Sequence, residues 1–235
     1  MIKLGCCGFP IAKGKYYRQF KAVEIQKTFY QPPKLGTAQR WREEAPASFE
    51  FTLKAWQLIT HPPQSPTYRR AMVEIPPSKK ESYGYFRPTD EVFAAWEETK
   101  RIAQALEAKL IVFQCPASFR PTSRNIKNME EFFSRAERGG MLFGWEPRGE
   151  WGREEIRELC CSLDLLHIVD PFKAQSLYGG LHYFRLHGRG GYRYRYSAEE
   201  LQQLKEWVEE KPTWVMFNNV YMLEDALRFA QLLGR

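Results

Sequence analysis

The chain has 235 residues, of which 43% are hydrophobic and 27% are charged, and its formal net charge is +7. This is the composition of an ordinary globular protein, and no apolar run approaches the roughly 20 residues that cross a bilayer, which excludes a membrane-spanning helix. The excess of positive charge favours anionic partners such as phosphorylated compounds or nucleic acid, but it does not identify the chemistry.

The cysteines and the first residues bear on the cellular compartment. Five cysteines include two vicinal pairs, Cys6-Cys7 and Cys160-Cys161, a spacing that fits neither a disulfide framework nor a zinc site. We expect buried free thiols. The first residues lack the apolar stretch and small-residue cleavage site of a secretory signal, so we expect a cytoplasmic protein without a membrane partner.

Short runs rich in β-branched and aromatic residues alternate with longer amphipathic segments, which is typical of βαβ units around a parallel sheet. Eight such strands close a (β/α)8 or TIM barrel, usually one domain of about 250 residues. We therefore predict a single α/β barrel domain over residues 1–235. The predicted strands are Ile2–Cys6, Ala22–Gln26, Phe49–Lys54, Lys109–Gln114, Met141–Glu146, Leu165–Asp170, His182–His187 and Thr213–Asn218.

Helical periodicity is clearest in three segments between these strands, Glu91–Glu107, Ser197–Glu210 and Leu223–Leu233. The second segment opens with Ser197 and Glu200, the spacing of a capping box. Two crossover helices look short or absent, because only Lys15–Phe20 and Phe172–Leu177 are available after the first and sixth strands.

The segment Thr60–Pro88 contains six prolines, which is too many for a helix. It is also too long for a simple turn. We interpret it as an insertion after the third strand that covers the barrel mouth, and we expect His61 or Tyr68 in the wall of that mouth.

Strand parity predicts a ring of polar side chains at the C-terminal ends of the strands. Side chains alternate between the barrel interior and the surrounding helices, so a polar residue flanked by apolar ones points inward. A merely packed barrel would carry aliphatic residues at these positions. The predicted ring is Glu24, Lys54, Gln114, Glu146, Asp170, Arg185, His187 and Asn218.

The same residues lie in longer phrases of sequence. These are Val23-Glu24-Ile25 with Thr28-Phe29-Tyr30, Ile59-Thr60-His61, Phe113-Gln114-Cys115-Pro116-Ala117-Ser118-Phe119, Arg185-Leu186-His187-Gly188 and Phe217-Asn218-Asn219. In this order they resemble the domain-of-unknown-function 72 family, also called YecE-like, over nearly the whole chain. The resemblance implies a TIM barrel without an established biochemical role. Departures from the family pattern occur at Gly8-Phe9-Pro10, Gln26-Lys27 and Glu146-Pro147-Arg148.

The ring is mixed in sign, which suits acid/base chemistry on an anion, because carboxylates and cations shift one another's pKa values. His187 is the natural proton shuttle, although a core histidine bonded to backbone is the competing interpretation. The predicted catalytic residues are Glu24, Lys54, Glu146, Asp170, Arg185 and His187. The predicted substrate-binding residues are Tyr30, His61, Gln114, Arg148, Arg189, Tyr192, Arg193, Arg195, Asn218 and Asn219.

The loop Gly188–Tyr196 joins a glycine-rich turn to alternating arginine and tyrosine. Loops after the seventh and eighth strands often form the phosphate site of a barrel, and interleaved arginine and tyrosine also suit stacking on single-stranded nucleic acid. We expect Arg185 and this loop to form an anion site; a solvated rim is the alternative.

The leading hypothesis is an enzyme of hydrolase or isomerase type that acts on a phosphorylated or otherwise anionic substrate. No cofactor is predicted. A divalent metal is the rival use of the carboxylates, but Lys54 and Arg185 would repel a cation there. The alternatives are a nucleic-acid-binding or repair-type phosphodiesterase, which resembles barrel endonucleases and requires a metal cluster, and a ligand-binding module without turnover.

Overall fold

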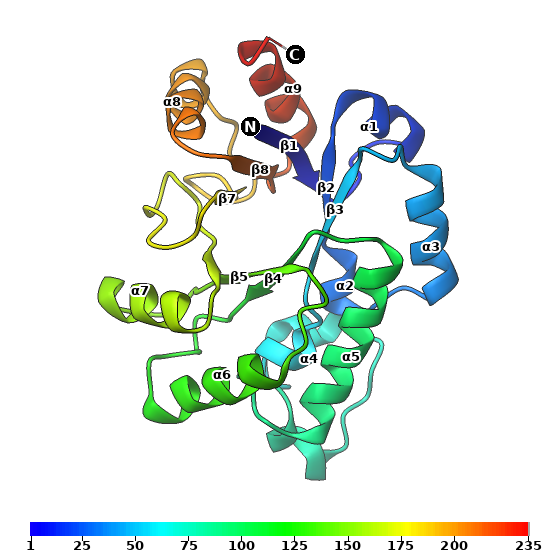
Figure 1. The fold of residues 1–235 in the computed structure, drawn as a ribbon, viewed down its shortest axis with the longest axis vertical. Coiled ribbons are helices and arrows are strands. Elements are labelled where there is room, and N and C mark those ends of the chain that lie inside the picture. The colour runs from blue at the N-terminus through cyan, green and yellow to red at the C-terminus, as the bar shows by residue number, and fades with distance from the viewer. Residues whose placement is uncertain (235) are drawn as a thin grey trace.

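The computed structural model describes residues 1–234, and its centre is an eight-stranded parallel sheet in the order β6-β5-β4-β3-β2-β1-β8-β7 (Figure 1). Helices surround the strands, and this arrangement confirms the predicted (β/α)8 barrel. The strands are β1 Ile2–Cys7, β2 Ala22–Ile25, β3 Glu50–Lys54, β4 Leu110–Gln114, β5 Leu142–Glu146, β6 Leu166–His167, β7 His182–Leu186 and β8 Thr213–Phe217.

The barrel closes between β6 and β7 through a single bridge. Val169 pairs with Phe184, and the Arg185 backbone N–H donates to the Val169 carbonyl at 2.9 Å. The predicted sixth strand, Leu165–Asp170, is too long, because only Leu166 and His167 pair with β5. Beyond His167 the chain leaves β5 to reach β7.

Two hydrophobic clusters fill the two sides of the strands. The smaller cluster lies inside the barrel and comprises Cys7, Ala22, Leu110, Val112, Leu166, Ile168, Tyr183, Trp214 and Met216. Several of these residues precede a predicted ring residue by two positions, as Val112 precedes Gln114. The larger cluster, which includes Trp96, Phe113 and Phe132, packs between the strands and the helices. The alternation therefore directs the ring residues to the inner side.

The helices match the amphipathic segments, but the crossover from β6 to β7 has none within residues 1–234. Ser197 and Glu200 form the expected capping box, with the Glu200 N–H donating to the Ser197 hydroxyl at 3.2 Å. The helices are α1 Lys13–Gln19, α2 Lys27–Tyr30, α3 Leu35–Glu44, α4 Gln57–Thr60, α5 Asp90–Ala105, α6 Ser123–Arg135, α7 Arg153–Ser162, α8 Ala198–Glu209 and α9 Met222–Leu232.

The proline-rich segment flanks the rim of the barrel. It contains two 3₁₀ helices, Pro66–Arg70 and Pro77–Ser82, and the second packs against α5. The Tyr68 hydroxyl donates to the His61 carbonyl at 2.9 Å, and the His61 ring packs edge-on against Phe29 at 4.8 Å. The segment thus builds the wall behind β2 and β3.

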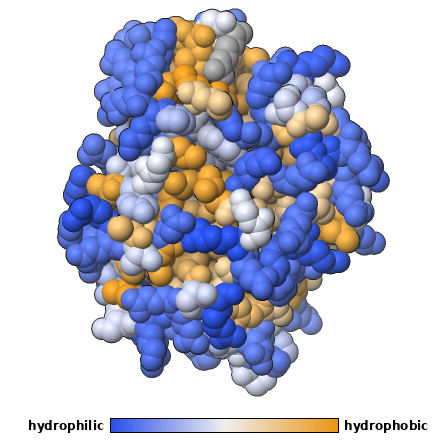
Figure 2. Space-filling model, viewed as in Figure 1, coloured by the Kyte–Doolittle hydropathy of each residue, from blue (hydrophilic) through white to orange (hydrophobic). Residues whose placement is uncertain are grey.

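The surface follows the amphipathic pattern of the sequence. Hydrophilic side chains cover α8 and much of the rim, whereas hydrophobic ones show toward the middle of the face in Figure 2. Among residues 1–234, no helix is long and apolar enough to span a membrane.

Gly5 in β1 lies where the backbone of β2 is too close for a side chain. A Cβ there would meet the Ala22 carbonyl oxygen at 2.1 Å. We expect Gly5→Ala to lower the free energy of unfolding by about 1–3 kcal/mol, the usual cost of overpacking. Urea unfolding measures the change.

Gly36 in α3 provides the matched control, because a Cβ there meets nothing within 4 Å. Gly36→Ala should raise the unfolding free energy by about 1 kcal/mol through helix propensity. Equal effects of the two substitutions would show that β1 and β2 do not constrain Gly5.

Candidate functional site

Arg185 is the centre of the charge network at the C-terminal ends of the strands. Its side chain is completely buried, and it holds Glu24 with two hydrogen bonds, Nε to Oε2 at 2.9 Å and Nη2 to Oε1 at 2.7 Å. Nη1 donates to Gln114 Oε1 at 3.1 Å and also to Glu146 Oε2. One guanidinium therefore links the ends of β2, β4, β5 and β7.

Mutual attraction keeps this buried network charged. Burial alone would raise the pKa of Glu146, but the guanidinium groups of Arg185 and Arg148 outweigh it and lower the pKa to about 2. Burial opposes the charge of Arg185, yet Glu146 and Glu24 hold the pKa of its guanidinium well above its usual value. Below the network, the Tyr183 hydroxyl donates to Glu24 Oε2 at 3.0 Å.

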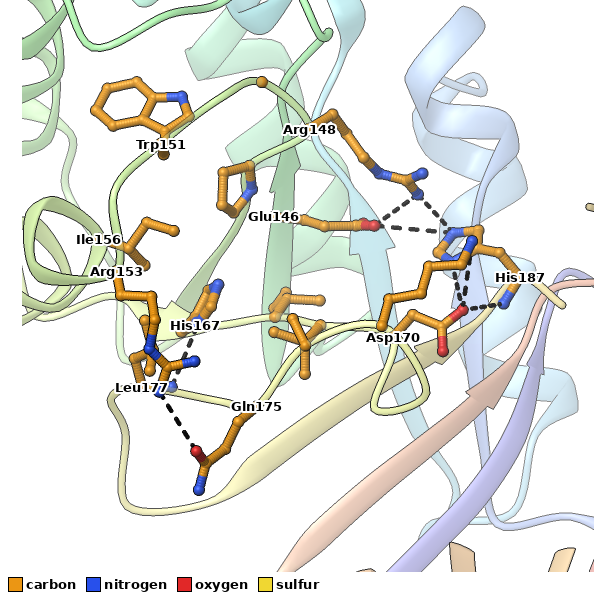
Figure 3. Close-up of a pocket in the computed structure, with 16 residues that line it drawn as sticks. Glu146, Arg148, Trp151, Arg153, Ile156, His167, Asp170, Gln175, Leu177 and His187 are labelled. Carbon is orange, nitrogen blue, oxygen red and sulfur yellow. Dashed lines mark hydrogen bonds and ion pairs between the residues drawn. The ribbon is translucent and has the colours of Figure 1, made fainter. Parts of the chain in front are cut away.

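A second set of polar groups surrounds the imidazole of His187, with Arg148 and Glu146 on one side and Asp170 on the other (Figure 3). Arg148 Nη2 lies 2.7 Å from His187 Nε2 and 2.6 Å from Glu146 Oε1. On the other side of the ring, Nδ1 lies 3.8 Å from Asp170 Oδ2. Asp170 itself accepts hydrogen bonds from the His187 and Phe172 backbone N–H groups, both at 3.1 Å.

These contacts define the protonation state of His187. A guanidinium can only donate, so Nε2 accepts and the proton of the neutral ring lies on Nδ1, facing Asp170. Burial lowers the pKa of His187, and the carboxylates of Asp170 and Glu146 only partly oppose it. The ring is therefore neutral near pH 7, with a basic nitrogen turned toward Arg148.

A cavity of about 280 Å³ opens beside His187, between the loop after β5 and the helix-free crossover after β6. Its polar wall carries the cations Arg148, Arg153 and Lys173, with Arg153 Nη2 3.4 Å from Gln175 Oε1 (Figure 3). The lining residues are Glu146, Pro147, Arg148, Gly149, Trp151, Arg153, Ile156, His167, Ile168, Val169, Asp170, Lys173, Ala174, Gln175, Leu177 and His187.

His167 belongs to the rear wall of this cavity. Its Nδ1 accepts the Leu177 backbone N–H at 3.2 Å, and burial lowers the pKa of its ring to about 4. A neutral histidine bonded to backbone holds the crossover segment in place.

Lys54, the last residue of β3, also points to the mouth. Its Nζ lies 3.5 Å from the centroid of the Phe29 ring. Burial and the charge of Arg185 lower the pKa of its ammonium to about 7.

The structure thus brings the eight ring residues to the C-terminal ends of the strands, although they do not all face the cavity. Glu24, Gln114, Glu146 and Arg185 are largely committed to one another. Asp170 and His187 face the cavity. Asn218 accepts a hydrogen bond from Gln26 Nε2 at 2.6 Å at the far side of the mouth.

Other predicted binding residues lie outside the cavity. Asn219 donates to the Tyr194 carbonyl at 2.8 Å and to Asp225 at 2.7 Å, which places it in the packing beneath α9. His61 is buried, with Nδ1 2.8 Å from the Thr60 hydroxyl. Tyr30 stacks on Arg70 at the rim.

The loop after β7 does not join Arg185 in an anion site. Arg189 pairs with Glu200 at 3.2 Å, and Arg195 stacks over Tyr221 at 4.3 Å. All nitrogens of Arg185 are used within the buried network. Tyr192 of this loop packs edge-on against His187, with ring centroids 6.2 Å apart.

Cys7 and Tyr183 are members of the network that the sequence interpretation missed. Cys7 Sγ lies 3.9 Å from Arg185 Nη2, so β1 also ends on an inward heteroatom. The parity signal was present, because Cys7 follows Gly5 by two, but the predicted strand stopped one residue early. Burial raises the pKa of the Cys7 thiol, which keeps it protonated.

The carboxylates considered above as metal ligands are engaged by arginine side chains. Within residues 1–234, no three His, Cys, Asp or Glu side chains are grouped to hold a metal ion. The oxygens of Glu24 and Glu146 instead accept hydrogen bonds from guanidinium groups.

Similarity to known proteins supports the fold and the family. A structure of a DUF72 family protein from Enterococcus faecalis V583 has a TM-score of 0.76 at 20% identity, covering 100% of this chain and 98% of that chain. A DUF72 family protein from Thermotoga maritima MSB8 has a TM-score of 0.71 at 24% identity, covering 100% of both chains.

A structure of a D-tagatose 3-epimerase-like protein shares the fold, with a TM-score of 0.58 at 16% identity over 99% of this chain and 96% of that chain. No curated protein matches the chain significantly. The family model "Protein of unknown function DUF72" matches residues 14–235. Because this match spans nearly the whole sequence, the chain belongs to the DUF72 family.

Proposed function

We propose that this protein is an enzyme that performs acid/base chemistry on a small anionic substrate in the cavity beside His187. The observation that carries the proposal is the position of His187, with Nδ1 toward Asp170 and Nε2 at the cavity, 2.7 Å from Arg148. A histidine whose ring is oriented by a carboxylate on one nitrogen is the usual form of a general base. The other nitrogen of His187 accepts a hydrogen bond from Arg148 until the substrate displaces that side chain.

The geometry divides the roles among the charged residues. Asp170 orients the His187 ring, and Nε2 removes a proton from the substrate once the anionic group of the substrate draws Arg148 away. Glu146, whose pKa is about 2, stays ionised and anchors Arg148. Glu24 and Arg185 are buried positioning residues, because their polar atoms face one another and not the cavity.

The cations of the cavity favour an anionic substrate. Arg148 is 33% exposed, and Arg153 and Lys173 share the lining with it. The guanidinium groups of Arg148 and Arg153 suit bidentate binding of phosphate or carboxylate, and the Lys173 ammonium adds a positive charge. Return of the proton by His187 to a neighbouring carbon gives an isomerase, and activation of water gives a hydrolase.

His187→Gln should lower kcat/KM by about 10²–10⁴, the range for loss of a general base. Sugar phosphates and phosphomonoesters, followed by ¹H and ³¹P NMR in D₂O, distinguish deuterium exchange from hydrolysis. Burial lowers the pKa of His187, so activity should rise with pH through an apparent pKa below 6.5 and be lost as the ring protonates.

The matched control is His182→Gln at the start of β7, where the His182 ring stacks on Phe184 outside the barrel. If both variants turn over substrate at the same rate, His187 has no part in the chemistry.

Arg148→Gln and Arg153→Gln should each weaken the binding of inorganic phosphate about tenfold, as loss of a charge-assisted contact costs roughly 1.5 kcal/mol or more. Isothermal titration calorimetry measures the affinity. Arg157→Gln is the control, because Arg157 lies on α7 together with Arg153 but pairs with Glu154 on the exposed side of the helix. Equal loss in the three variants would indicate a general charge effect.

The exposed loop after β7 favours a second candidate function, binding of single-stranded nucleic acid. Tyr192 is 60% exposed there, among arginines that suit phosphate and base contacts. If this candidate holds, replacing Arg189, Arg193 and Arg195 with alanine weakens oligo(dT) binding in fluorescence anisotropy and lowers the salt slope by about 1 per lost contact. Unchanged binding removes the candidate.

A further inference from the structure

The Lys54 amine lacks the ion-paired partners that Arg148, Arg185 and Lys173 have. Among residues 1–234, its nitrogen has neither a hydrogen bond nor an ion pair, and it lies 3.5 Å from the centroid of the Phe29 ring. The nearby carboxylates are occupied, Glu24 by Arg185 and Tyr183, and Glu146 by Arg185 and Arg148.

The nitrogen nevertheless keeps some contact with solvent. The residue retains 7% of its exposure, and Nζ is not among the fully enclosed polar atoms that lack a partner. Glu146 and Arg148, which act on the charge of Lys54, also line the cavity. The amine is thus neither a structural ion pair nor a sealed core group.

We propose that Lys54 is a nucleophilic amine that condenses with an aldehyde or ketone carbonyl of the substrate at the barrel mouth. This inference rests on the proposed function, because the same mouth has to admit the substrate. It adds a substrate class, small anionic carbonyl compounds such as oxo acids or the open-chain form of sugar phosphates.

The surroundings of Lys54 supply the neutral amine that such a reaction needs. Burial lowers the pKa first, Arg185 and Arg148 lower it further, and Glu146 and Glu24 only partly offset them, which leaves the pKa near 7. A lysine desolvated beside another cation is a known route to an activated amine. At pH 7 its neutral fraction is roughly a thousand times that of an exposed lysine.

The condensation balances without an oxidant or reductant. The Nζ lone pair attacks the carbonyl carbon, the C–O π pair moves to oxygen, and one amine proton transfers to that oxygen to give a carbinolamine. The C–O bond then breaks, and the second amine proton leaves with the hydroxyl as water. A C=N bond to Lys54 remains, and hydrolysis reverses each step.

Reductive labelling of the unmodified protein tests the proposal. Formaldehyde or glyoxylate is added with cyanoborohydride at pH 7, and peptide mass spectrometry follows each lysine. The internal comparison is Lys173, which lines the cavity and is 48% exposed, so accessibility alone predicts that it reacts first. We expect Lys54 to be labelled at least about ten times faster, because its larger neutral fraction exceeds its loss of access.

The two probes separate this proposal from the proposed function. Faster labelling of Lys173 by both probes would overturn the nucleophilic role of Lys54. A third outcome is that formaldehyde labels Lys54 first, glyoxylate shows no preference for Lys54, and Arg148→Gln leaves glyoxylate labelling unchanged. In that case Lys54 is a nucleophile, but the proposal of an anionic substrate is wrong. Both proposals are supported if glyoxylate labels Lys54 faster than Lys173 and the Arg148→Gln substitution slows the labelling of Lys54.

Discussion

Burial of the Arg185 guanidinium between Glu24 and Glu146 is the interaction on which the geometry of the barrel mouth depends. Removing charged groups from water costs several kcal/mol for each ion, and the cost is offset only where hydrogen bonding is nearly complete. Arg185 meets that condition, because Nε, Nη1 and Nη2 all have carboxylate or amide acceptors. Loss of one partner from such a pair typically destabilises a protein by about 3–5 kcal/mol. The network therefore fixes the ends of β2, β5 and β7 relative to one another.

The same network decides which groups at the mouth can exchange protons near neutral pH. Glu146 gives one oxygen to Arg185 and the other to Arg148, and its low pKa follows from both cations. His187 lies two residues beyond Arg185, directly after the end of β7, so the buried ion pairs of Arg185 also fix the position of His187. The ionised Glu146 holds Arg185 and Arg148 in place. Burial lowers the pKa of His187, which keeps its ring neutral, and it lowers the pKa of the Lys54 amine to about 7.

Strand parity predicted the ring residues because the side chains of a regular strand alternate strictly between its two faces. Gln114 follows Val112 and Asn218 follows Met216, and the interior side of each strand continues into the mouth. Strand parity predicts whether a side chain points into the barrel, but not how deeply it is buried. From the sequence alone, the buried Arg185 could therefore not be distinguished from a substrate-binding cation. The loop arginines have no such period, and their partners, Glu200 and Tyr221, depend on where α8 and the start of α9 pack. Asn219 has the opposite parity to Asn218 and accordingly points into the packing.

The missing helix after β6 determines where the cavity lies. In a complete βα unit a helix would cover this side of the barrel, whereas here residues 171–181 cross to β7 without one, and part of that segment lines the cavity. The charged network occupies the barrel axis, so the space for a ligand is displaced toward β5 and β6. Glu146 and Arg148 line this lateral cavity and also act on the charge of Lys54. Arg148, the more exposed of the two, thus connects the cavity and His187 with the buried network, because it contacts both His187 and Glu146.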